Sequence, residues 1–294
     1  MINQQQILIS IILPTYNHAK FLKKAIKSVI KQSYVHWELI IIDNNSTDGT
    51  FELVNSFLDH RIRYIKIHNN GIIAASRNAG ISLSSGSWIA FLDSDDWWTP
   101  DKLIECTMRI NKVNPDLIYH DLFLVDKPNQ NNFKKFARSR NLYTPIYEDL
   151  LLHGNGILNS SVLLRKELLT DIGLLSCDKE KITWEDYDCW LRLSQKTEKF
   201  LYINKPLGYY WAAGGNMTNP DRDLVNAKSI YNIYIREQFS IIPSWILFSE
   251  AKALIKKGLK KDGIAKLNCI NVINYSILDF IKSRVIILVA LLNN

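Results

Sequence analysis

Three carboxylates follow a short apolar run in the first third of the chain. Asp93, Asp95 and Asp96 come almost directly after residues 88–92, which read Trp-Ile-Ala-Phe-Leu. An apolar run this short, preceded by Gly86, is typical of a buried central strand. Clustered carboxylates repel one another and are costly to desolvate, unless a divalent cation and a phosphate-bearing ligand lie beside them. The alternative is a solvated turn in which Asp96 or Asp101 caps the next helix.

The surrounding elements favour the ligand site. A further buried strand is predicted at residues 7–13, other strands at 37–42 and 62–67, and helices at 19–32, 50–58, 72–82 and 101–112. Strand, polar loop and helix therefore alternate, which predicts βαβ units around a parallel sheet. Ligands of such sheets bind at the carboxyl ends of the strands, where this chain places its polar residues.

The pattern is looser after residue 112. We expect a strand at 116–125, a mobile, basic and Asn-rich excursion at 127–140, and a short strand at 160–165. A helix opens within residues 183–188, and two short strands follow at 201–203 and 208–211. From residue 221 the chain is predicted to be helical to its end, with a break at Pro243.

Composition narrows the class of protein. The 294 residues are 47% hydrophobic and 11% aromatic, which excludes a disordered chain. A net charge of +7 is compatible with nucleic acid, anionic membrane or an anionic substrate, but no nucleic-acid module is recognisable, so we expect no nucleic-acid partner. The four cysteines are scattered, as in reduced cytosolic proteins. No apolar run approaches the ~20 residues that span a bilayer, so a cytosolic or membrane-surface protein is expected.

Four segments together resemble glycosyltransferase family 2, in that family's order and spacing: residues 11–17, 41–50, 75–80 and 91–96. Trp184-Glu185-Asp186 is similar to the family's later "ED" motif. The resemblance implies a GT-A fold, that is, a Rossmann-like α/β domain whose mixed, mainly parallel sheet is flanked by helices. It also implies a nucleotide-diphosphate-sugar donor, Mn²⁺ or Mg²⁺, and an inverting mechanism. We expect a catalytic domain over 1–220, with a nucleotide-binding half (1–100) and an acceptor half (101–220), and a helical C-terminal extension over 221–294.

The resemblance assigns residues to the nucleotide. Asp43 resembles the family's uracil-binding aspartate, since a carboxylate accepts a hydrogen bond from the uracil imide; an N-cap or Asx-turn is the alternative, and both can hold. Arg77 matches a basic residue near the nucleotide, where a guanidinium suits phosphate; a solvent-facing helix residue is the alternative. The other candidates line the nucleoside pocket or adjoin these residues: Pro14, Thr15, Tyr16, Asn17, Asn70 and Ser94.

The same comparison assigns the metal and the base. Asp93 and Asp95 match the family's DxD motif, so Asp95 would ligate the cation and Asp93 would contact the ribose or the ion's waters. Asp96 would contact the donor sugar. Asp186 matches the general base, which takes the acceptor hydroxyl's proton, and Glu185 would orient the base or bind acceptor. Without the motif, acidic residues at a helix start are ordinary capping.

One departure concerns the metal. Many family members carry a histidine after the next strands, whereas residues 209–218 contain none. Gly214 and Gly215 could form a loop over the donor phosphates, or a mere turn. The cation would then be held by Asp95, the diphosphate and water.

The C-terminal stretch has two interpretations. Five lysines (Lys252, Lys256, Lys257, Lys260 and Lys261) stand among apolar residues, and Ile277 to Leu292 is mostly apolar. The segment could lie in a membrane interface, at the cytoplasmic face of the inner membrane, or pack on the catalytic domain or a second copy. The membrane interpretation fits a lipid-diphosphate-linked glycan acceptor, as used by relatives that build bacterial O-antigen or capsule.

The predicted activity is transfer of a hexose, glucose or galactose, from a UDP-sugar to that acceptor. A nucleotidyltransferase making NDP-sugars is the first alternative, although the Gly-rich basic loop expected after its first strand is missing at residues 14–17. The second alternative is a non-catalytic nucleotide-sugar-binding protein, which would tolerate loss of Asp186.

Overall fold

The computed structural model describes residues 6–128, 130, 132–213 and 220–292. The chain divides into two compact units, which we call the sheet unit and the helical unit. The sheet unit comprises Met1–Leu142, Gly156–Cys177 and Glu185–Gly215. The helical unit comprises Tyr143–Asn155, Asp178–Trp184 and Asn216–Asn294. The functional division expected at residue 220 stays a prediction.

One mixed sheet organises the sheet unit, and within the described residues it has nine strands. Their order is β3-β2-β1-β4-β8-β6-β9-β5, and β7 pairs with β6. The longer pairings, β1 with β2 and β4, β2 with β3, and β6 with β9, are parallel. This confirms the predicted mixed, mainly parallel sheet. The strands are β1 (Ile9–Thr15), β2 (Trp37–Asp43), β3 (Ile62–Lys66), β4 (Trp88–Phe91), β5 (Trp97–Trp98), β6 (Leu117–Val125), β7 (Phe136–Ala137), β8 (Leu163–Arg165) and β9 (Phe200–Trp211).

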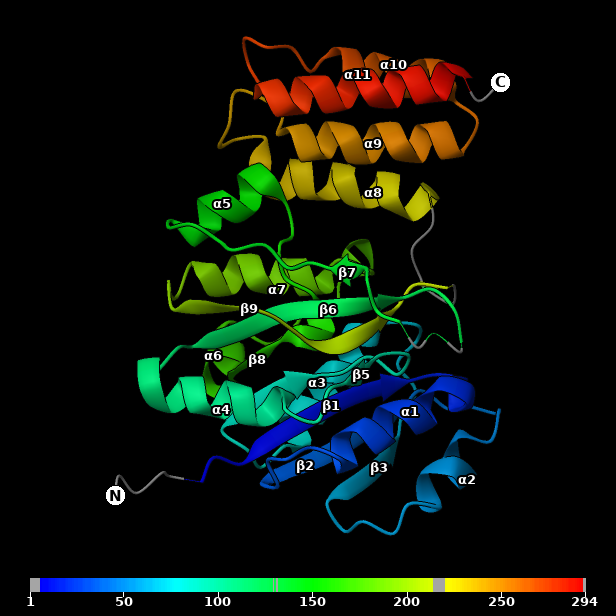
Figure 1. Cartoon of the computed structure of the whole chain (residues 1–294), viewed down its shortest axis with the longest axis vertical. Coiled ribbons are helices and arrows are strands. Elements are labelled where there is room, and N and C mark those ends of the chain that lie inside the picture. Colours follow the sequence, from blue (N-terminus) through cyan, green and yellow to red (C-terminus); the bar gives the residue numbers. More distant parts are fainter. Residues whose placement is uncertain (1–5, 129, 131, 214–219, 293–294) are drawn as a thin grey trace. The chain divides into compact units, whose positions relative to one another are not determined.

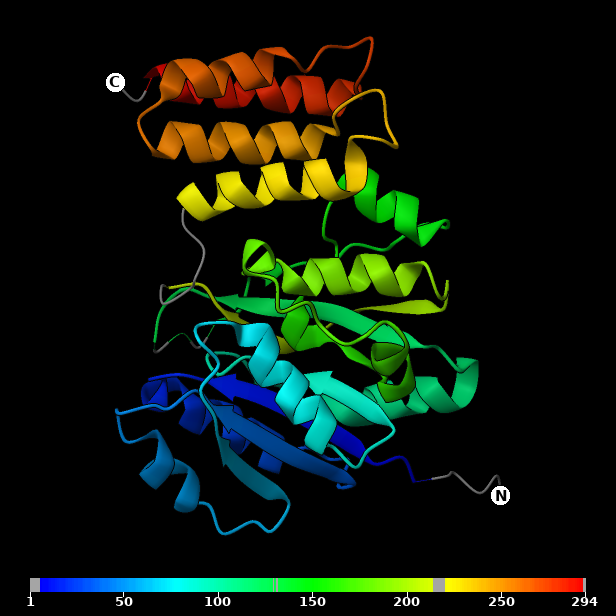
Figure 2. The ribbon, with the colours of Figure 1, turned by 180° about the vertical axis from the view of Figure 1, so that it is seen from behind.

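Helices cover both faces of the sheet because the central strands are apolar on both sides. Ile9, Ile11 and Leu13 of β1 belong to a buried cluster that also contains residues of α1 (Ala19–Ile30) and α4 (Lys102–Val113). Ile12 points to the opposite face, against α3 (Ile73–Leu83). Accordingly, α1 lies in front of the sheet in Figure 1 and α3 in front of it in Figure 2. The remaining helices of this unit are α2 (Thr50–Asn55), η1 (Asn159–Ser161), α6 (Lys166–Asp171) and α7 (Glu185–Ser194).

A glycine sets the distance between α3 and the sheet. A Cβ atom on Gly80 would lie 2.6 Å from Cγ2 of Ile12, closer than carbon atoms pack. Glycine therefore lets the helix approach β1 and β2 closely. Arg77 stands one turn earlier on the same helix, so this packing also fixes the position of the guanidinium.

The chain reverses its direction of winding at β1. From β1 the order runs outward through β2 to β3, and β4 then pairs on the other side of β1. The β4 pairing ends at Phe91 opposite Ile12, whereas β2 follows β1 as far as Thr15. Pro14 therefore lies beyond the last β4 pair, where its missing N–H removes no ladder bond from that side. Such a topological switch point is where open α/β sheets bind ligands.

Several predicted boundaries need correction. The stretch 127–140, expected as a mobile excursion, contains β7, which pairs with β6. The two strands expected at 201–203 and 208–211 form one strand, β9, because irregular register allows continuous pairing with β6. By contrast, the helix expected to open within residues 183–188 does so, at Glu185. Besides β7, the elements that were not predicted include β5, α5 (Ile146–His153), α6 and the short helices η1 and η2 (Lys179–Lys181).

The helical unit confirms the predicted C-terminal helices and the break at Pro243, which directly precedes α9. Its helices run side by side, with α9 between α8 and the α10–α11 pair (Figures 1 and 2). Leu247, Phe248 and Ala251 of α9 pack with Leu267 and Ile270 in its core. Among the described residues, no helix is both long and apolar enough to cross a bilayer. The elements are η2 (Lys179–Lys181), α5, α8 (Pro220–Ile230), the π-helical turn η3 (Tyr231–Ile235), α9 (Ser244–Lys256), α10 (Lys260–Asn268) and α11 (Ile277–Leu292).

Candidate active site

Two loops at the carboxyl edge of the sheet are joined by hydrogen bonds. The Asn17 side chain accepts from the Thr47 N–H (2.8 Å), and the Asn17 N–H donates to Ser46 Oγ (2.8 Å). Asn17 has a left-handed backbone (φ 49°), which asparagine tolerates better than most residues. The loops after β1 and β2 therefore form one rigid edge.

Asp43 ends β2 and is fully buried. Its carboxylate accepts from the Ser46 N–H (3.1 and 3.2 Å), the Ser46 hydroxyl and the Tyr64 hydroxyl (2.5 Å). The bond to the N–H three residues on is a local contact of the N-cap type, one of the alternatives that the sequence left open. Burial and the Asp43 carboxylate raise the pKa of Tyr64, so its hydroxyl remains a donor.

Tyr16 has the accessibility expected of a base-stacking residue. It is 58% exposed, whereas Pro14 and Thr15 beside it are buried. The Thr15 hydroxyl has no hydrogen-bond partner among the described residues. Asn70, another nucleotide-binding candidate, is exposed and has a left-handed backbone (φ 53°).

Asp93 is held from three sides. Arg77 Nη2 lies 2.8 Å from Oδ1, Asn159 Nδ2 donates to both oxygens (3.1 and 3.2 Å), and the Asp93 N–H donates to Ser160 Oγ (3.1 Å). Asn159 and Ser160 belong to η1, so this short helix fixes the carboxylate at the end of β4.

The three residues after Asp93 differ in environment. Ser94 Oγ lies 2.8 Å from His18 Nδ1, across the switch point between β1 and β4. Asp95 is half-buried, and burial together with the charge of Asp93 raises the pKa of Asp95 to about 6. Asp96 is buried and accepts from the Trp211 N–H (3.0 Å). Burial, followed by Asp95 and Asp93, raises the pKa of Asp96 well above its usual range.

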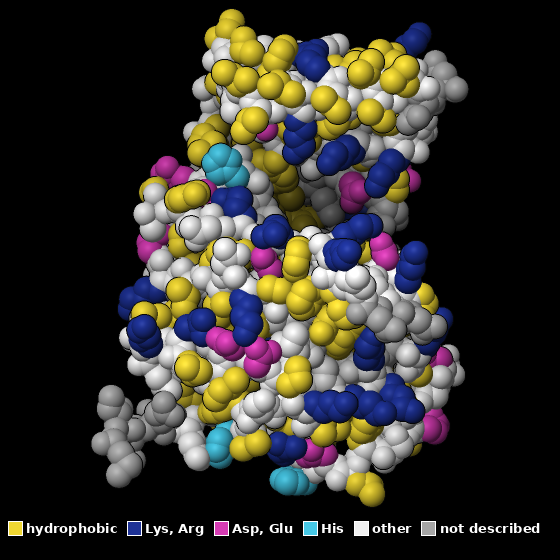
Figure 3. Space-filling view, viewed as in Figure 1, with side chains coloured by type: hydrophobic (Ala, Val, Ile, Leu, Met, Phe, Trp, Pro, Cys, Tyr) yellow, Lys and Arg dark blue, Asp and Glu magenta, His cyan; other side chains and the backbone are white. Residues whose placement is uncertain are grey.

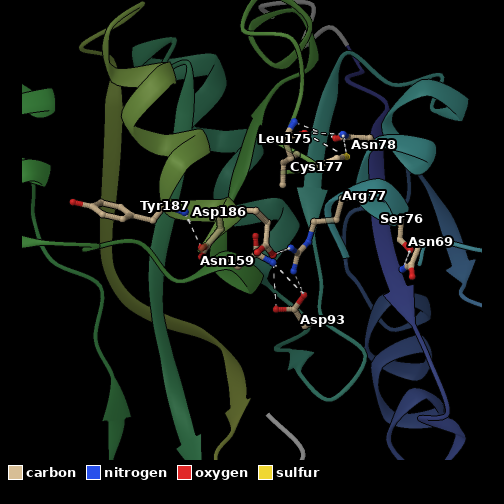
Figure 4. A network of polar contacts seen from close by, with 11 residues as sticks. Asn69, Ser76, Arg77, Asn78, Asp93, Asn159, Leu175, Cys177, Asp186 and Tyr187 are labelled. Carbon is tan, nitrogen blue, oxygen red and sulfur yellow. Dashed lines mark hydrogen bonds and ion pairs between the residues drawn. The ribbon is translucent and has the colours of Figure 1, made fainter. Parts of the chain in front are cut away.

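Arg77 joins the two acidic motifs (Figure 4). Its side chain is 4% exposed, with Nη2 on Asp93 (2.8 Å) and Nη1 on Glu185 Oε1 (2.5 Å). Burial opposes the charged form, but Asp93 and Glu185 outweigh it and raise the pKa of Arg77. The guanidinium predicted near phosphate is thus paired with two carboxylates through Nη1 and Nη2, whereas its Nε has no hydrogen-bond partner among the described residues. Its contact with a nucleotide stays a prediction.

The carboxyl of Asp186 has a pKa that is shifted toward neutrality. Burial and the neighbouring Glu185 raise the pKa of Asp186 to about 7, although Arg77 pulls it down. One carboxylate oxygen accepts from the Tyr187 N–H (2.7 Å) at the start of α7 (Figure 4). Glu185 is buried and faces Arg77, which suits orienting the base better than binding an acceptor. A carboxylate that titrates near neutrality can both take and release a proton there.

The residues fit a divalent cation that is shared with a ligand. Asp93, Asp95 and Asp96 bring three carboxylates together, and the raised pKa of Asp95 reflects negative charge that the protein does not fully balance. In the described part of the chain, no group of three or more His, Cys, Asp or Glu side chains could hold an ion by itself. Oxygen ligands from a diphosphate would complete such a site, as is common for Mg²⁺.

Sequence reasoning missed three members of this site. His18 lay in a predicted loop but was given no role, and Asn159 and Ser160 carry no motif. Only the fold brings η1 beside Asp93, so no sequence signal marked them. The proposed loop at Gly214–Gly215 lies outside the described residues.

A family model and a relative of known name match much of this chain. The family model for glycosyl transferase family 2 matches residues 10–173. A UDP-Glc:alpha-D-GlcNAc-diphosphoundecaprenol beta-1,3-glucosyltransferase of Escherichia coli, WfgD, is 33% identical over 63% of this chain and 69% of its own.

Two solved structures share the fold. S. aureus TarS in complex with UDP-GlcNAc has a TM-score of 0.62 at 17% identity, over 89% of this chain and 79% of its own. The mannosyltransferase PcManGT of Pyrobaculum calidifontis, in complex with GDP-Man and Mn²⁺, has a TM-score of 0.61 at 15% identity, over 98% and 81%. These likenesses confirm the predicted GT-A fold.

Proposed function

This chain belongs to glycosyltransferase family 2, and we propose that it transfers a hexose from a UDP-sugar to a lipid-diphosphate-linked glycan. The family assignment favours glycosyl transfer over the nucleotidyltransferase alternative. The names of the donor and acceptor of WfgD support the choice of substrates, with glucose or galactose as the expected sugar. The product would be a bacterial surface polysaccharide such as O-antigen.

The nucleotide would bind at the switch point between β1 and β4. Tyr16 offers an exposed ring to the base, and the Asp43 carboxylate would accept a hydrogen bond from the uracil imide. Because Tyr64 and Ser46 already bond to Asp43, uracil would displace one of them or share an oxygen with it. The exposed Asn70 and the loop residues Asn17 and Ser94 would complete this part of the site.

Asp95 would hold Mn²⁺ or Mg²⁺, with Asp93 beside it. When bound, the cation neutralises the charge that develops on the departing nucleoside diphosphate. Asp93 would keep its fixed orientation through Arg77 and Asn159. Asp96 accepts a hydrogen bond from the Trp211 N–H, so we propose that it fixes residues 93–96 beside the donor sugar.

Asp186 would act as the base of an inverting displacement. The acceptor hydroxyl oxygen forms a bond to the anomeric carbon while the bond from that carbon to the diphosphate oxygen breaks. The hydroxyl proton passes to Asp186, and the electron pair of the broken bond leaves with UDP. Glu185 would orient Asp186 through its ion pair with Arg77.

One observation carries the proposal. Arg77 brings the metal-binding motif and the base motif to one centre, although it is 108 residues from Glu185 in the sequence. A nucleotide-binding protein without catalysis has no need of a second carboxylate with a pKa of about 7 at this position.

The test is transfer from a panel of UDP- and GDP-sugars, with Mn²⁺, to a synthetic GlcNAc- or GalNAc-diphosphate lipid. We expect transfer from one UDP-hexose, loss of activity in Asp95→Ala and Asp186→Asn, and inversion of the anomeric centre by NMR of the product. Asp171→Asn, which changes an exposed carboxylate at the end of α6, is the matched control and should retain activity. Nucleotide-sugar binding without transfer to any acceptor would favour the non-catalytic alternative, and an active Asp186→Asn would remove this residue as the base.

The lipid part of the acceptor would place the reaction at the cytoplasmic face of the inner membrane. This location is a consequence of the proposed acceptor. The acceptor by itself does not identify the surface of the protein that would meet the lipid.

A further inference from the structure

Helix α11 is apolar on two sides, but only one side is covered. Ser283 and Ala290 are buried, and Ile286 and Ile287 pack against the core of the helical unit. The other side, which we call the α11 face, consists of six residues that are each at least 50% exposed: Leu278, Ile281, Val285, Leu288, Val289 and Leu292. A helix that is apolar all round is normally buried all round.

The α11 face is continuous. Its members recur at spacings of three and four residues, which places them on one side of the helix. In Figure 3, hydrophobic side chains gather over α11 in the helical unit. Soluble monomers rarely leave an apolar patch of this kind uncovered unless it binds something.

A cluster of like charges lies beside this face. Burial, followed by the charges of Lys282 and Lys256, lowers the pKa of Lys252, so these three ammonium groups lie near one another. Lys282 belongs to α11 and lies 4.6 Å from the centre of the Phe248 ring of α9. Within the described ranges, none of the three has an acidic partner at ion-pair distance, in contrast to Lys257 with Asp221 and Lys266 with Glu250.

We propose that the α11 face and the lysine cluster Lys252–Lys256–Lys282 form a docking surface for an anionic phospholipid bilayer. The apolar side chains would enter the boundary between headgroups and acyl chains, with the helix lying in the plane of the membrane. Lysines at the border of the face would meet the phosphate groups of anionic lipid, which relieves their mutual repulsion. The helix has 16 residues, about 24 Å at ~1.5 Å per residue, so it lies on a bilayer and does not cross it.

A second copy of the chain is the competing occupant. A dimer contact through this face would bring the lysine clusters of two copies toward one another and add to their repulsion. The positive charge of the lysine cluster therefore favours an anionic membrane over a second copy of the chain as the partner of the α11 face.

The test is co-sedimentation of the full chain with vesicles of equimolar phosphatidylglycerol and phosphatidylcholine, and with pure phosphatidylcholine vesicles. Neither donor nor acceptor is present, so the outcome is independent of the proposed transfer reaction. One variant changes Leu278, Ile281, Val285 and Leu288 to Ser, and another changes Lys252, Lys256 and Lys282 to Gln. All seven side chains are exposed, so folding should be kept, which circular dichroism checks.

Wild type should bind the anionic vesicles. The lysine variant should bind them roughly 100-fold more weakly at low salt, since each lysine near an anionic surface contributes about five-fold. The apolar variant should lose at least about ten-fold on the same vesicles. Matched controls remove the same number of exposed groups elsewhere: Val35, Leu58, Met108 and Val113 to Ser, and Lys23, Lys27 and Lys31 to Gln. The controls should bind like wild type.

Two results would overturn the proposal. One is equal vesicle binding by wild type and the apolar variant. The other is a wild type that ignores vesicles but forms a dimer that the apolar variant abolishes, since the face would then be a contact between copies.

Discussion

Replacing Arg77 by Met should lower the free energy of unfolding and raise the pKa of Asp186 further. The guanidinium is buried and pairs with Asp93 and Glu185. Met keeps most of the apolar volume but leaves Glu185, itself buried, facing other carboxylates without a cation.

The expected loss of unfolding free energy is about 3–5 kcal/mol, the usual result of removing one partner from a buried ion pair. A second effect concerns the base. Because Arg77 lowers the pKa of Asp186, its removal should move that pKa further above 7. In the profile of kcat against pH, the limb in which activity rises with pH should therefore shift to higher pH in the variant, by roughly one pH unit or more.

Urea denaturation measures the first effect, and the pH dependence of kcat for UDP release measures the second. Arg109→Met is the matched control because Arg109 pairs with Glu105 at the surface of α4. Both side chains are partly exposed, and an i,i+4 pair of this kind on a helix contributes about 0.5 kcal/mol or less. Arg77→Lys, which keeps the charge but not the planar fork, should recover part of both effects.

A double variant decides whether charge is the cause. Arg77→Met combined with Glu185→Gln removes both charges, so it should be more stable than Arg77→Met alone, by roughly 1–3 kcal/mol. If Glu185→Gln brings no recovery, or if Arg77→Met unfolds like wild type, the argument from the buried ion pair is wrong.

Three further changes have distinct expected outcomes. Asp186→Asn should lose transfer, yet above pH ~7 its free energy of unfolding in urea should exceed that of wild type by about 1–3 kcal/mol. The raised folded-state pKa of Asp186 favours the folded wild type only while the carboxyl is protonated, so the difference between the two proteins should vanish below pH ~4. Gly80→Ala should cost about 1–3 kcal/mol in thermal unfolding, since the new Cβ meets Ile12 at 2.6 Å. Tyr16→Ala should raise the KM for the UDP-sugar several-fold with little change in stability, because the ring is 58% exposed.

Each of these outcomes has a control. Asp171→Asn should unfold like wild type at every pH. A pH-dependent stability difference in this variant would indicate a general effect of charge. Gly173→Ala meets no atom within 4 Å but has φ +75°, so any cost there reports backbone strain instead of a clash. Tyr143→Ala removes a similarly exposed ring, and a matching rise in KM would argue against base stacking by Tyr16.

The parallel half of the fold was predictable because most of its strands are nearly continuous apolar runs. Residues 7–13, 37–42 and 88–92 lie in or beside β1, β2 and β4, which are buried on both faces, so no alternation is needed to detect them. The strand β3 within residues 62–67 is only partly buried. The strand β5, only two residues long, was hidden in Trp97-Trp98 because such a pair has no period. Likewise α6 is too short for helical spacing to be visible.

The site was predictable as a set of motifs but not as a network. The carboxylates Asp93, Asp95 and Asp186 were proposed from local patterns, and the structure places Asp93 and Asp186 around Arg77. That Arg77 would pair with two carboxylates could not be predicted, since both of its partners lie outside α3. The contacts of Asn159 and Ser160 with Asp93 likewise depend on the antiparallel pairing of β8 with β4, which nothing local encodes.

The contact between Arg77 and Glu185 also bears on the order in which the chain folds. A link across 108 residues closes a long loop, so we expect it to form after the shorter-range pairings of β1 to β4 have reduced the entropy of closure. During synthesis, α3 and β4 leave the ribosome well before α7, and until then Arg77 has only Asp93. A fragment that ends with the family-matching residues, at 173, would lack Glu185 and Asp186 altogether. The centre is therefore completed late in folding, and a nascent chain gains its base only after its donor-side loops are in place.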